Sequence, residues 1–358
     1  MKKITAVCLL ILILIIPQLG CNTQVNNTGI SKTSYHLNTI CTVTVYSMNG
    51  LESLSEDEIQ KEVLTLITDT FRLCDSYEKK LSKTIEGSDI YNINHAGGKA
   101  VKVSEETLKV VQKGIKYGEL SEGAFDITIG KVTDLWNFQE MDDQGNHIGE
   151  IPDENAVSDA ASHVNYKNIV IEGDAIRLLD PQSEIDLGGI AKGYIADKVA
   201  EYLESEGVTS AIVDLGGNIV VIGEKGKDIN TAEGTKFAVG IKDPQSENGG
   251  LLGLYMSKDK TIVTSGTYER YFEIDGKRYH HVLDSKTGHP IDTDLLSVTI
   301  IGEKGSSADC DGISTSCLAL GKEKGLALVK QIPGIEAIFV DKDGTVTKSS
   351  EDVELVKG

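Results

Sequence analysis

The chain has few of the residues that mark several common classes of protein. It has one Trp, 5% aromatic residues and six Pro among 358 residues. So few aromatic rings argue against a stacking platform for single-stranded nucleic acid or carbohydrate. The formal net charge of -20 leaves no basic footprint for a phosphate backbone, so we expect no nucleic-acid partner. An anionic ligand therefore has to be met locally, by a metal ion, a helix N-terminus or a single Lys.

Several catalytic and metal-binding motifs are missing as well. The sequence has no HExxH, no paired-Cys zinc spacing, no P-loop, no GxGxxG and no GxSxG. The adjacent histidines His280 and His281 would point to opposite faces of a strand, so they do not easily share one metal ion. These absences exclude the enzyme classes that depend on those motifs.

The N-terminus has the features of a targeting segment. Two lysines precede an apolar run over 6–16, which is too short for an ordinary membrane-spanning helix, and a Gly-Cys pair ends at Cys21. This arrangement resembles a bacterial lipobox. We therefore predict a signal peptide over 1–20, lipidation of Cys21, a flexible tether over 21–34, and an extracytoplasmic protein held to the bacterial cell membrane by lipid alone. The alternative is cleavage and release.

The rest of the chain has enough apolar material for a large core, with 40% hydrophobic and 25% charged residues. A capping box at 55–58 precedes apolar residues at helical spacing, which predicts a long amphipathic helix over 55–82. Alternation of apolar and polar residues predicts a strand over 36–47. Further short strands are predicted along the chain, the last of them over 345–348. Helices and strands follow no regular βαβ rhythm, so we predict the α+β class, with one folded domain over 35–350.

Four cysteines remain after the lipobox: Cys41, Cys74, Cys310 and Cys317. None forms a CxxC pair, and their spread along the chain is unlike a small disulfide scaffold. We expect buried free thiols, with two disulfides as the alternative in an exported protein.

A glycine-rich segment, Asp186-Leu-Gly-Gly-Ile-Ala-Lys-Gly193, stands where a helix is predicted to begin. Glycines let the backbone approach a ligand closely, and the exposed N–H groups with the helix dipole suit a phosphate. Lys192 adds a mobile positive charge. Taken alone, the segment also fits a strand-to-helix turn without a ligand. The tetrapeptide Asp-Leu-Gly-Gly recurs at 214–217, which indicates either an old duplication or two similar corners.

A second polar segment lies in a predicted helix over 307–320. Asp311 and Thr315 stand at i and i+4 and share one face of that helix. A carboxylate and a hydroxyl are hard oxygen donors, which suit Mg²⁺ rather than zinc. The alternative is structural: Asp309 or Asp311 caps the helix, and Thr315 bonds back to the preceding turn.

A third stretch, over 264–273 and 278–290, is dense in polar groups between predicted strands, and taken alone it fits two hairpins with solvated loops. Together with an upstream Gly-Ala-Phe-Asp-Ile-Thr, these segments resemble the ApbE-like FAD:protein FMN transferases. The matching pieces occur in the family's order and span about 35–340: Gly123–Thr128, Asp186–Gly193, Val213–Asn218, Thr264–Phe272, His280–Pro290 and Asp311–Thr315.

This resemblance implies an ApbE-like α+β fold related to the T-fold architecture, with mixed or antiparallel sheets and flanking helices. It implies that FAD is bound, its pyrophosphate is split, FMN passes to a threonine hydroxyl of an acceptor protein, and AMP leaves. The implied acceptor is a flavoprotein subunit of a membrane redox complex or an exported flavoprotein.

The resemblance also assigns roles to residues. Mg²⁺ would be held by Asp311, Thr315 and the backbone carbonyl of Gly189. A base is needed for the incoming hydroxyl, and His281 is the first candidate, with Asp311 as the second. The residues implied to line the FAD site are Ala124, Phe125, Asp126, Asp186, Lys192 and Val282.

Four positions depart from the family's pattern. Leu37-Asn38-Thr39 stands where the family has a Met-Gly-Thr that touches flavin, and Thr84 stands in place of a Tyr. Thr267 replaces a common Asp, and Ser285 replaces a common Pro. The first two departures concern flavin stacking and FAD affinity and leave the metal and phosphate chemistry intact.

Three other functions stay open at this point. The same residues suit a Mg²⁺-dependent FAD pyrophosphatase that gives FMN and AMP without an acceptor. The departures at Leu37 and Thr84 leave room for an FAD-binding lipoprotein. The leader alone also suits a solute-binding lipoprotein, although the chain shows no alternation of two similar lobes.

Overall fold

One large antiparallel sheet carries the fold. The computed structural model describes residues 29–51, 53–138, 148–225, 235–246 and 249–357. The strands of the sheet, in spatial order, are β1 (Ile30–His36), β2 (Thr39–Met48), β6 (Val208–Leu215), β7 (Asn218–Ile222), β10 (Lys260–Gly266), β13 (Leu295–Glu303), β14 (Glu336–Asp341) and β15 (Val346–Lys348).

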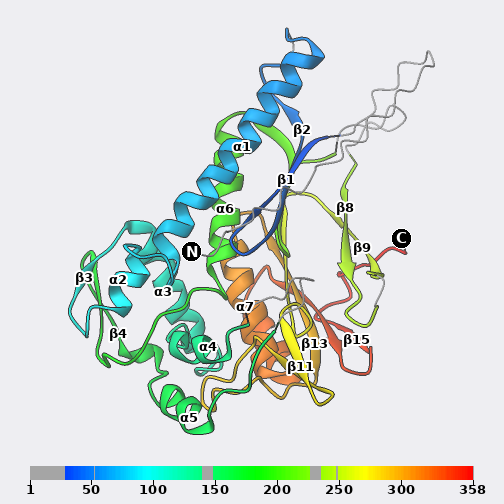
Figure 1. Cartoon of the computed structure of the whole chain (residues 1–358). Helices are drawn as coiled ribbons and strands as arrows, with labels where there is room; N and C mark the ends of the chain where they lie inside the picture. Colours follow the sequence, from blue (N-terminus) through cyan, green and yellow to red (C-terminus); the bar gives the residue numbers. More distant parts are fainter. Residues whose placement is uncertain (1–28, 52, 139–147, 226–234, 247–248, 358) are drawn as a thin grey trace.

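Helices cover one face of this sheet and a hairpin covers the other (Figure 1). The helices are α1 (Glu56–Leu81), α6 (Ala191–Ser205), α7 (Ser307–Leu320) and α8 (Lys322–Val329). The hairpin consists of β8 (Phe237–Lys242) and β9 (Leu251–Ser257).

The sheet buries both faces because its apolar residues lie on both. In β7, Val220 and Ile222 belong to the core under the helices, whereas Val221 belongs to the smaller core under the β8–β9 hairpin. The same alternation places Val263 and Ile262 of β10 on opposite faces. Successive strand residues point to opposite faces, so an unbroken apolar run is what a strand covered on both sides requires.

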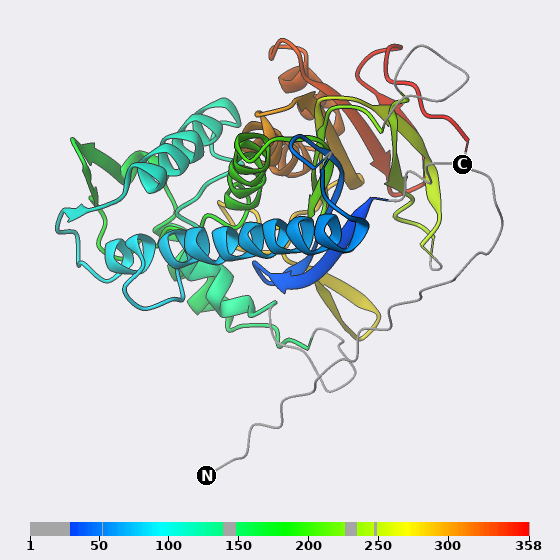
Figure 2. The same ribbon diagram turned by 90° about the horizontal axis from the view of Figure 1, so that it is seen from above.

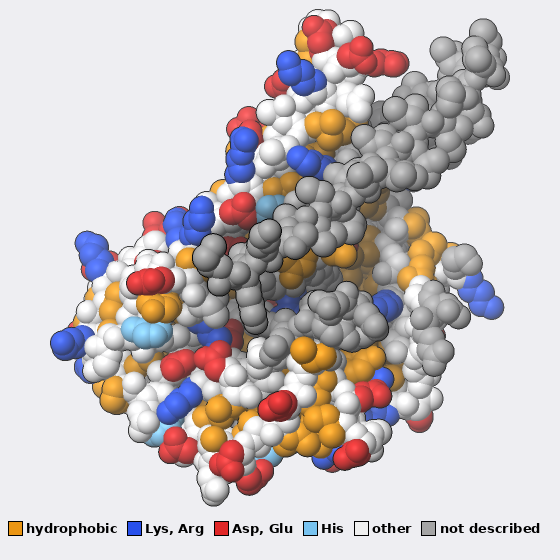
Figure 3. All heavy atoms as spheres, in the orientation of Figure 1, with side chains coloured by type: hydrophobic (Ala, Val, Ile, Leu, Met, Phe, Trp, Pro, Cys, Tyr) orange, Lys and Arg blue, Asp and Glu red, His pale blue; other side chains and the backbone are white. Residues whose placement is uncertain are grey.

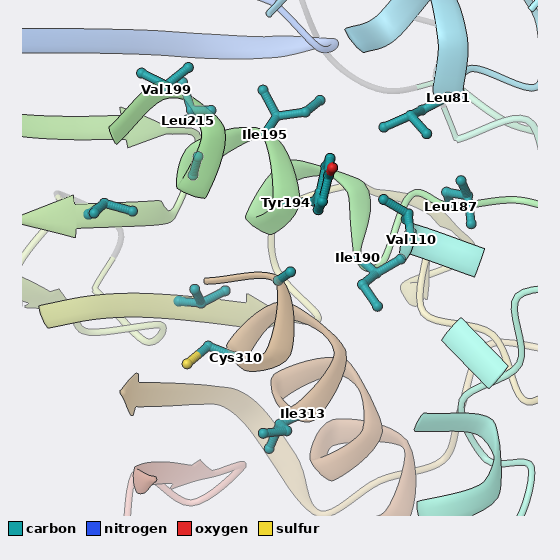
Figure 4. Close-up of a cluster of buried hydrophobic side chains, with 14 of the residues drawn as sticks. Leu81, Val110, Leu187, Ile190, Tyr194, Ile195, Val199, Leu215, Cys310 and Ile313 are labelled. Atoms are coloured by element: carbon teal, nitrogen blue, oxygen red, sulfur yellow. The ribbon is translucent and has the colours of Figure 1, made fainter. Parts of the chain in front are cut away.

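The helical layer is built around α1 and the contact of α6 with α7. The predicted capping box is present at the start of α1, where Ser55 N donates to Glu58 Oε2 at 2.9 Å. Helices α6 and α7 cross closely at Gly193, where a Cβ would lie 2.2 Å from the carbonyl oxygen of Ser307. Their buried side chains, among them Ile195 and Ile313, fill the space between them and the sheet (Figure 4).

The remaining elements form a second region beside the sheet (Figure 2). It contains a small three-stranded sheet, several short helices and a separate hairpin. Its elements are α2 (Asp89–Asn94), β3 (Val101–Lys102), α3 (Glu105–Leu120), α4 (Gly130–Trp136), α5 (Glu154–Ser162), η1 (Tyr166–Asn168), β4 (Ile169–Glu172), β5 (Ala175–Leu178), β11 (Tyr271–Ile274) and β12 (Lys277–His280).

The architecture confirms the α+β class, and it corrects the predicted domain limits. Residues 30–34, predicted as tether, form most of β1 and pair with 41–45 of β2. A polar edge strand needs only one strand partner, so its composition resembles that of a linker. At the other end the fold continues past 350, since Val353 is buried and residue 356 pairs with β9. Residues 1–28, with Cys21, lie outside the described part.

Helix α5 was not predicted, and residues 139–147 lie outside the described part. Cys41, Cys74, Cys310 and Cys317 are buried and free. None of the described helices has the length and apolar composition needed to cross a membrane. On the face shown in Figure 3, acidic and basic side chains are interspersed among the described residues.

Candidate functional site

The glycine-rich segment at 186–189 forms a corner that leads directly into α6. Asp186 Oδ1 accepts a hydrogen bond from Gly188 N at 2.8 Å, and Oδ2 accepts one from Thr133 Oγ1 at 2.9 Å. Gly189 faces α7: a Cβ built on it would lie 3.5 Å from Thr315 Oγ1 and 3.0 Å from Phe125 Cε2. A side chain at Gly189 would therefore crowd the space in front of Thr315.

Helix α7 presents Asp311 and Thr315 toward this corner. Asp311 is 3% exposed, and its Oδ2 accepts from Gly193 N in the first turn of α6 at 2.9 Å. Burial raises the pKa of Asp311, and Lys192, the Gly193 N–H and the Asn218 amide lower it in part. The predicted i, i+4 pair and the glycine corner are thus brought together by the packing of α6 against α7.

The two structural alternatives for this helix do not describe it. Its first N–H groups, at Ser307 and Ala308, donate to Asp197 of α6 at 2.9 and 3.0 Å, so Asp311 is not the cap. Asp309 instead pairs with Lys113 at 2.8 Å on the α3 side.

The hydroxyl of Thr315 is oriented differently from those of its neighbours. Ser314 and Ser316 donate back to carbonyls of the preceding turn at 2.9 and 2.6 Å. Thr315 Oγ1 lies 3.3 Å from Ser265 Oγ on β10. The Thr315 hydroxyl is therefore not committed to its own helix.

The second Asp-Leu-Gly-Gly corner lies across from the first. Residues 214–217 turn the chain from β6 into β7, with positive φ at Gly216 (65°) and Gly217 (90°). Lys192 Nζ of α6 donates to the Gly216 carbonyl at 3.5 Å. Burial raises the pKa of Asp214, Glu269 and Asp311, and the charge of Lys192 acts in the opposite direction on each, so its ammonium lies among three carboxylates.

The stretch between β10 and β13 adds His281 and Glu269. His281 N donates to Arg270 O at 3.0 Å, and its Nδ1 lies 3.3 Å from the same carbonyl. Burial, followed by the nearby Arg270 and His280, lowers the pKa of His281 to about 3. The imidazole is therefore neutral at pH 7, and with Nδ1 donating to the carbonyl, Nε2 is left as the acceptor.

Glu269 is desolvated although its side chain reaches solvent. Burial raises its pKa, with Lys192 and Arg270 acting in the opposite direction, yet the residue is exposed. Glu269 Oε1 lies 3.8 Å from where a Cβ of Gly217 would be, so Glu269 lies beside the second corner.

The implied FAD-lining residues differ in whether their polar atoms already have hydrogen-bond partners in the fold. Phe125 packs beside Gly189, and Ile291 N donates to the carbonyl of Val282 at 3.0 Å. Both oxygens of Asp126 are already used, by Thr128 N at 2.8 Å and by Tyr166 N at 2.7 Å. Asp126 therefore fixes the local backbone with both of its carboxylate oxygens.

A divalent cation is compatible with this arrangement of oxygens. No three His, Cys, Asp or Glu side chains cluster within the described ranges in a way that holds a metal. An ion at this place would therefore use the Thr315 hydroxyl and a backbone oxygen besides Asp311. Hard oxygen ligands of this kind, with water completing the shell, are what Mg²⁺ prefers. Two surface cavities of about 380 and 410 Å³ lie elsewhere, between α3 and α6 and along α1.

Comparison with known proteins agrees with this geometry. The model of the ApbE family matches residues 37–339. The chain belongs to the ApbE family. It is 32% identical over 337 residues to the FAD:protein FMN transferase of Treponema pallidum, covering 91% of this chain and 88% of that protein. It is 35% identical over 288 residues to the FAD:protein FMN transferase of Klebsiella pneumoniae, covering 80% and 85%.

Solved ApbE structures have the same fold. The flavin transferase ApbE from Vibrio cholerae superposes with a TM-score of 0.73 at 26% identity, covering 89% of this chain and 96% of that one. The ApbE protein from Thermotoga maritima gives 0.73 at 29% identity, covering 90% and 97%. The predicted family and fold are thereby confirmed.

Of the departures of this ApbE-family chain, those at Leu37-Asn38 and Thr84 lie in a turn and at an exposed position, whereas Thr267 and Ser285 are buried. Leu37 and Asn38 form the β1–β2 turn with φ of 53° and 56°, and Asn38 O accepts from Arg270 at 3.1 Å. Thr84 is exposed after α1. Ser285 Oγ donates to the Gly123 carbonyl at 2.5 Å, so the residue that replaces Pro ties two site segments together.

Sequence reasoning missed several residues of the ApbE site. Lys83 donates to the Gly130 carbonyl and to Thr133 Oγ1 at 2.7 and 2.8 Å, and Thr133 in turn holds Asp186. Asn218 and Glu269 lie inside matched segments but were not singled out. A polar residue at the start of an otherwise apolar strand was the available indication for Asn218.

Proposed function

We propose that this chain is an FAD:protein FMN transferase that moves FMN from FAD to a threonine hydroxyl of an acceptor flavoprotein, with Mg²⁺ and with release of AMP. The single observation that carries the proposal is the convergence of Asp311, Thr315, Gly189 and Lys192 between two glycine corners. The names of the relatives support the transfer of FMN, and the donor set supports Mg²⁺.

The residues of the corners suit the pyrophosphate of FAD. Of the backbone N–H groups over 188–193, those of Gly188, Ile190, Ala191 and Gly193 are used within the fold. Those of Gly189 and Lys192 are left for a ligand at the start of α6, where the helix dipole favours negative charge. Lys192 supplies a positive charge beside them. These groups are fixed by the fold before the substrate binds, so they stabilise charge that develops on the leaving AMP without reorganising.

Mg²⁺ would be held by Asp311, Thr315 and the Gly189 carbonyl, and it would neutralise charge on the two phosphates. The acceptor hydroxyl attacks the phosphorus on the FMN side, the P–O bond to the AMP phosphate breaks, and the hydroxyl proton passes to a base. His281 is the first candidate base because one ring nitrogen is left to accept a proton, although burial lowers its pKa to about 3 and so weakens it as a base. Asp311 is the second.

The place of action follows from the leader. Lipidation at Cys21 and export would put the enzyme at the outer side of the cell membrane, where the acceptor is a subunit of a membrane redox complex or an exported flavoprotein. Residues 21–29 give a short connection between the lipid and β1, so the folded part would stay near the membrane.

The test is incubation with FAD, MgCl₂ and candidate acceptors that carry an exposed threonine, followed by intact mass and AMP measurement. A mass gain of one FMN with equimolar AMP supports transfer. FMN and AMP in solution with an unmodified acceptor would indicate the pyrophosphatase, and FAD returned unchanged would indicate a binding protein. A His281→Ala variant that keeps the full rate would remove His281 from the role of base.

A further inference from the structure

Asn218, the first residue of β7, is a buried amide without partners. It is 1% exposed, and neither Oδ1 nor Nδ2 makes a hydrogen bond to any described residue. Leaving a buried polar group unpaired destabilises the folded state. Asn94 shows the usual arrangement, since its Nδ2 donates to Ile185 O at 2.9 Å and its Oδ1 accepts from Ile185 N at 2.7 Å. The unpaired amide of Asn218 therefore points to a partner that binds at this place.

The position of Asn218 indicates which partner that is. Val220 and Ile222 of β7 face the helical layer, and Asn218 has the same parity along the strand, so it faces α6 and α7. Its amide lies near enough to the Asp311 carboxylate to lower the pKa of that group, although the geometry of a hydrogen bond is not reached. On β10, which pairs with β7, Ser265 contacts Thr315. Asn218 thus lies beside the proposed cation ligands without being one of them.

We propose that Asn218 is a positioning residue of the cation site, whose Nδ2 donates to the Asp311 carboxylate and whose Oδ1 accepts from a water molecule bound to the cation. The proposal rests on the proposed Mg²⁺ site. Gly193 N already fixes Asp311 Oδ2, so a second donor sets the direction of the other oxygen. Mg²⁺ keeps several of its waters in proteins, and these waters are strong donors that need acceptors. Residues that orient a metal ligand in this way typically change metal affinity about 10- to 100-fold.

The test measures stability and metal affinity separately, on the full-length protein. Asn218→Leu replaces the amide by an apolar group of similar size. We expect the thermal midpoint in EDTA not to fall, because two unpaired atoms are removed. We also expect the Kd for Mg²⁺, measured by calorimetry without FAD, to rise about 10- to 100-fold.

Asn94→Leu is the matched control, because it removes an amide whose two hydrogen bonds are made. Its midpoint in EDTA should fall by about 2–4 °C or more, with Mg²⁺ affinity within about twofold of wild type. Asn218→Asp is the second variant, since it folds with the same shape. It puts a second carboxylate beside Asp311, so its midpoint in EDTA should fall, and Mg²⁺ should raise it by more than it raises the wild type.

The outcomes separate this proposal from the proposed function. Wild-type protein that binds no Mg²⁺ overturns both the cation site and the role of Asn218. Wild-type binding together with unchanged affinity in Asn218→Leu overturns the role of Asn218 alone. A fall of the midpoint in EDTA for Asn218→Leu as large as that for Asn94→Leu would also overturn it, since it would show an ordinary structural amide.

Discussion

The two Asp-Leu-Gly-Gly corners have the same four residue types but different backbone conformations. At 186–189 the chain enters α6, and Asp186 Oδ1 accepts from Gly188 N at 2.8 Å. At 214–217 the chain reverses between two strands, and Asp214 Oδ1 accepts from Gly217 N at 3.0 Å. Positive φ occurs at both glycines of the second corner and at neither glycine of the first. A glycine pair therefore permits a corner without specifying its shape.

The residues that follow each corner decide its shape. After the first come Ile-Ala-Lys-Gly and a helical periodicity, and after the second come Asn-Ile-Val-Val-Ile, which is rich in β-branched residues. The functional consequence differs accordingly. The first corner offers backbone N–H groups at a helix start, whereas the second holds the Lys192 ammonium and places Asn218 under α7.

We expect the largest effect on FMN transfer from a substitution of Asp311. Asp311→Asn keeps the shape of the side chain but removes the charged ligand. We expect FMN transfer to fall about 10³-fold, together with a large loss of Mg²⁺ affinity in calorimetry. Asp309→Asn, two residues away and paired with Lys113, is the matched control and should lose stability but keep turnover. Full activity of Asp311→Asn would refute the cation assignment.

The next largest effect concerns the Lys192 ammonium, which lies between the two corners. Lys192→Met keeps the stem and removes the charge, and we expect kcat/KM for FAD to fall about 10²-fold because charge on the leaving phosphate loses a partner. Lys198→Met lies on the same helix, with its ammonium 2.6 Å from Glu201, and it should stay near wild type. Equal losses in both variants would show that α6, rather than the ammonium, is being perturbed.

A pair of alanine substitutions separates the corners directly. In Gly189→Ala, the new Cβ intrudes between Phe125 and Thr315, so transfer should fall about 10- to 100-fold with little change in stability. In Gly217→Ala, the φ of 90° is strained, so the free energy of unfolding should fall by about 1–2 kcal/mol. A rate assay should show that Gly189→Ala is the slower variant, and urea titration should show that Gly217→Ala is the less stable one. If one variant is the more impaired in both assays, the prediction is wrong.

The smallest effect on turnover is expected at Asp197, which joins α6 to α7 and makes stability depend on pH. Burial raises the pKa of Asp197 to about 6 from its ordinary 3.8. The folded state then binds the proton more tightly than the unfolded state, so the contribution of Asp197 to stability falls as pH rises from about 4 to 6. Asp197→Asn should remove this slope from the free energy of unfolding measured across that range. An unchanged slope would assign the pH dependence to other groups.

Much of the fold was predictable because it depends on local pattern. The capping box at Ser55 and the apolar spacing behind it specify α1, and short unbroken apolar runs specify strands such as β10 and β14. β1 and α5 were missed for one reason. Both are largely polar, and each is stabilised by a neighbour rather than by its own periodicity.

The candidate site divides in the same way. The i, i+4 relation of Asp311 and Thr315 follows from helix geometry alone, and the structure places Thr315 beside Gly189 and Asp311 beside Gly193. Asp126 was expected beside the ligand, yet its carboxylate is used by Thr128 and Tyr166. Which atoms a carboxylate contacts depends on segments 40 residues away, and no local pattern contains that information.

The sequence by itself determined the elements, their order, and the placing of oxygen donors on one helix face, because these depend on spacings of two to four residues. The close crossing of α6 and α7 at Gly193, the meeting of the two corners through Lys192 and the unpaired amide of Asn218 were decided only in three dimensions. Each depends on how segments far apart in the chain pack, and packing is set by the summed burial of the whole core rather than by any short stretch.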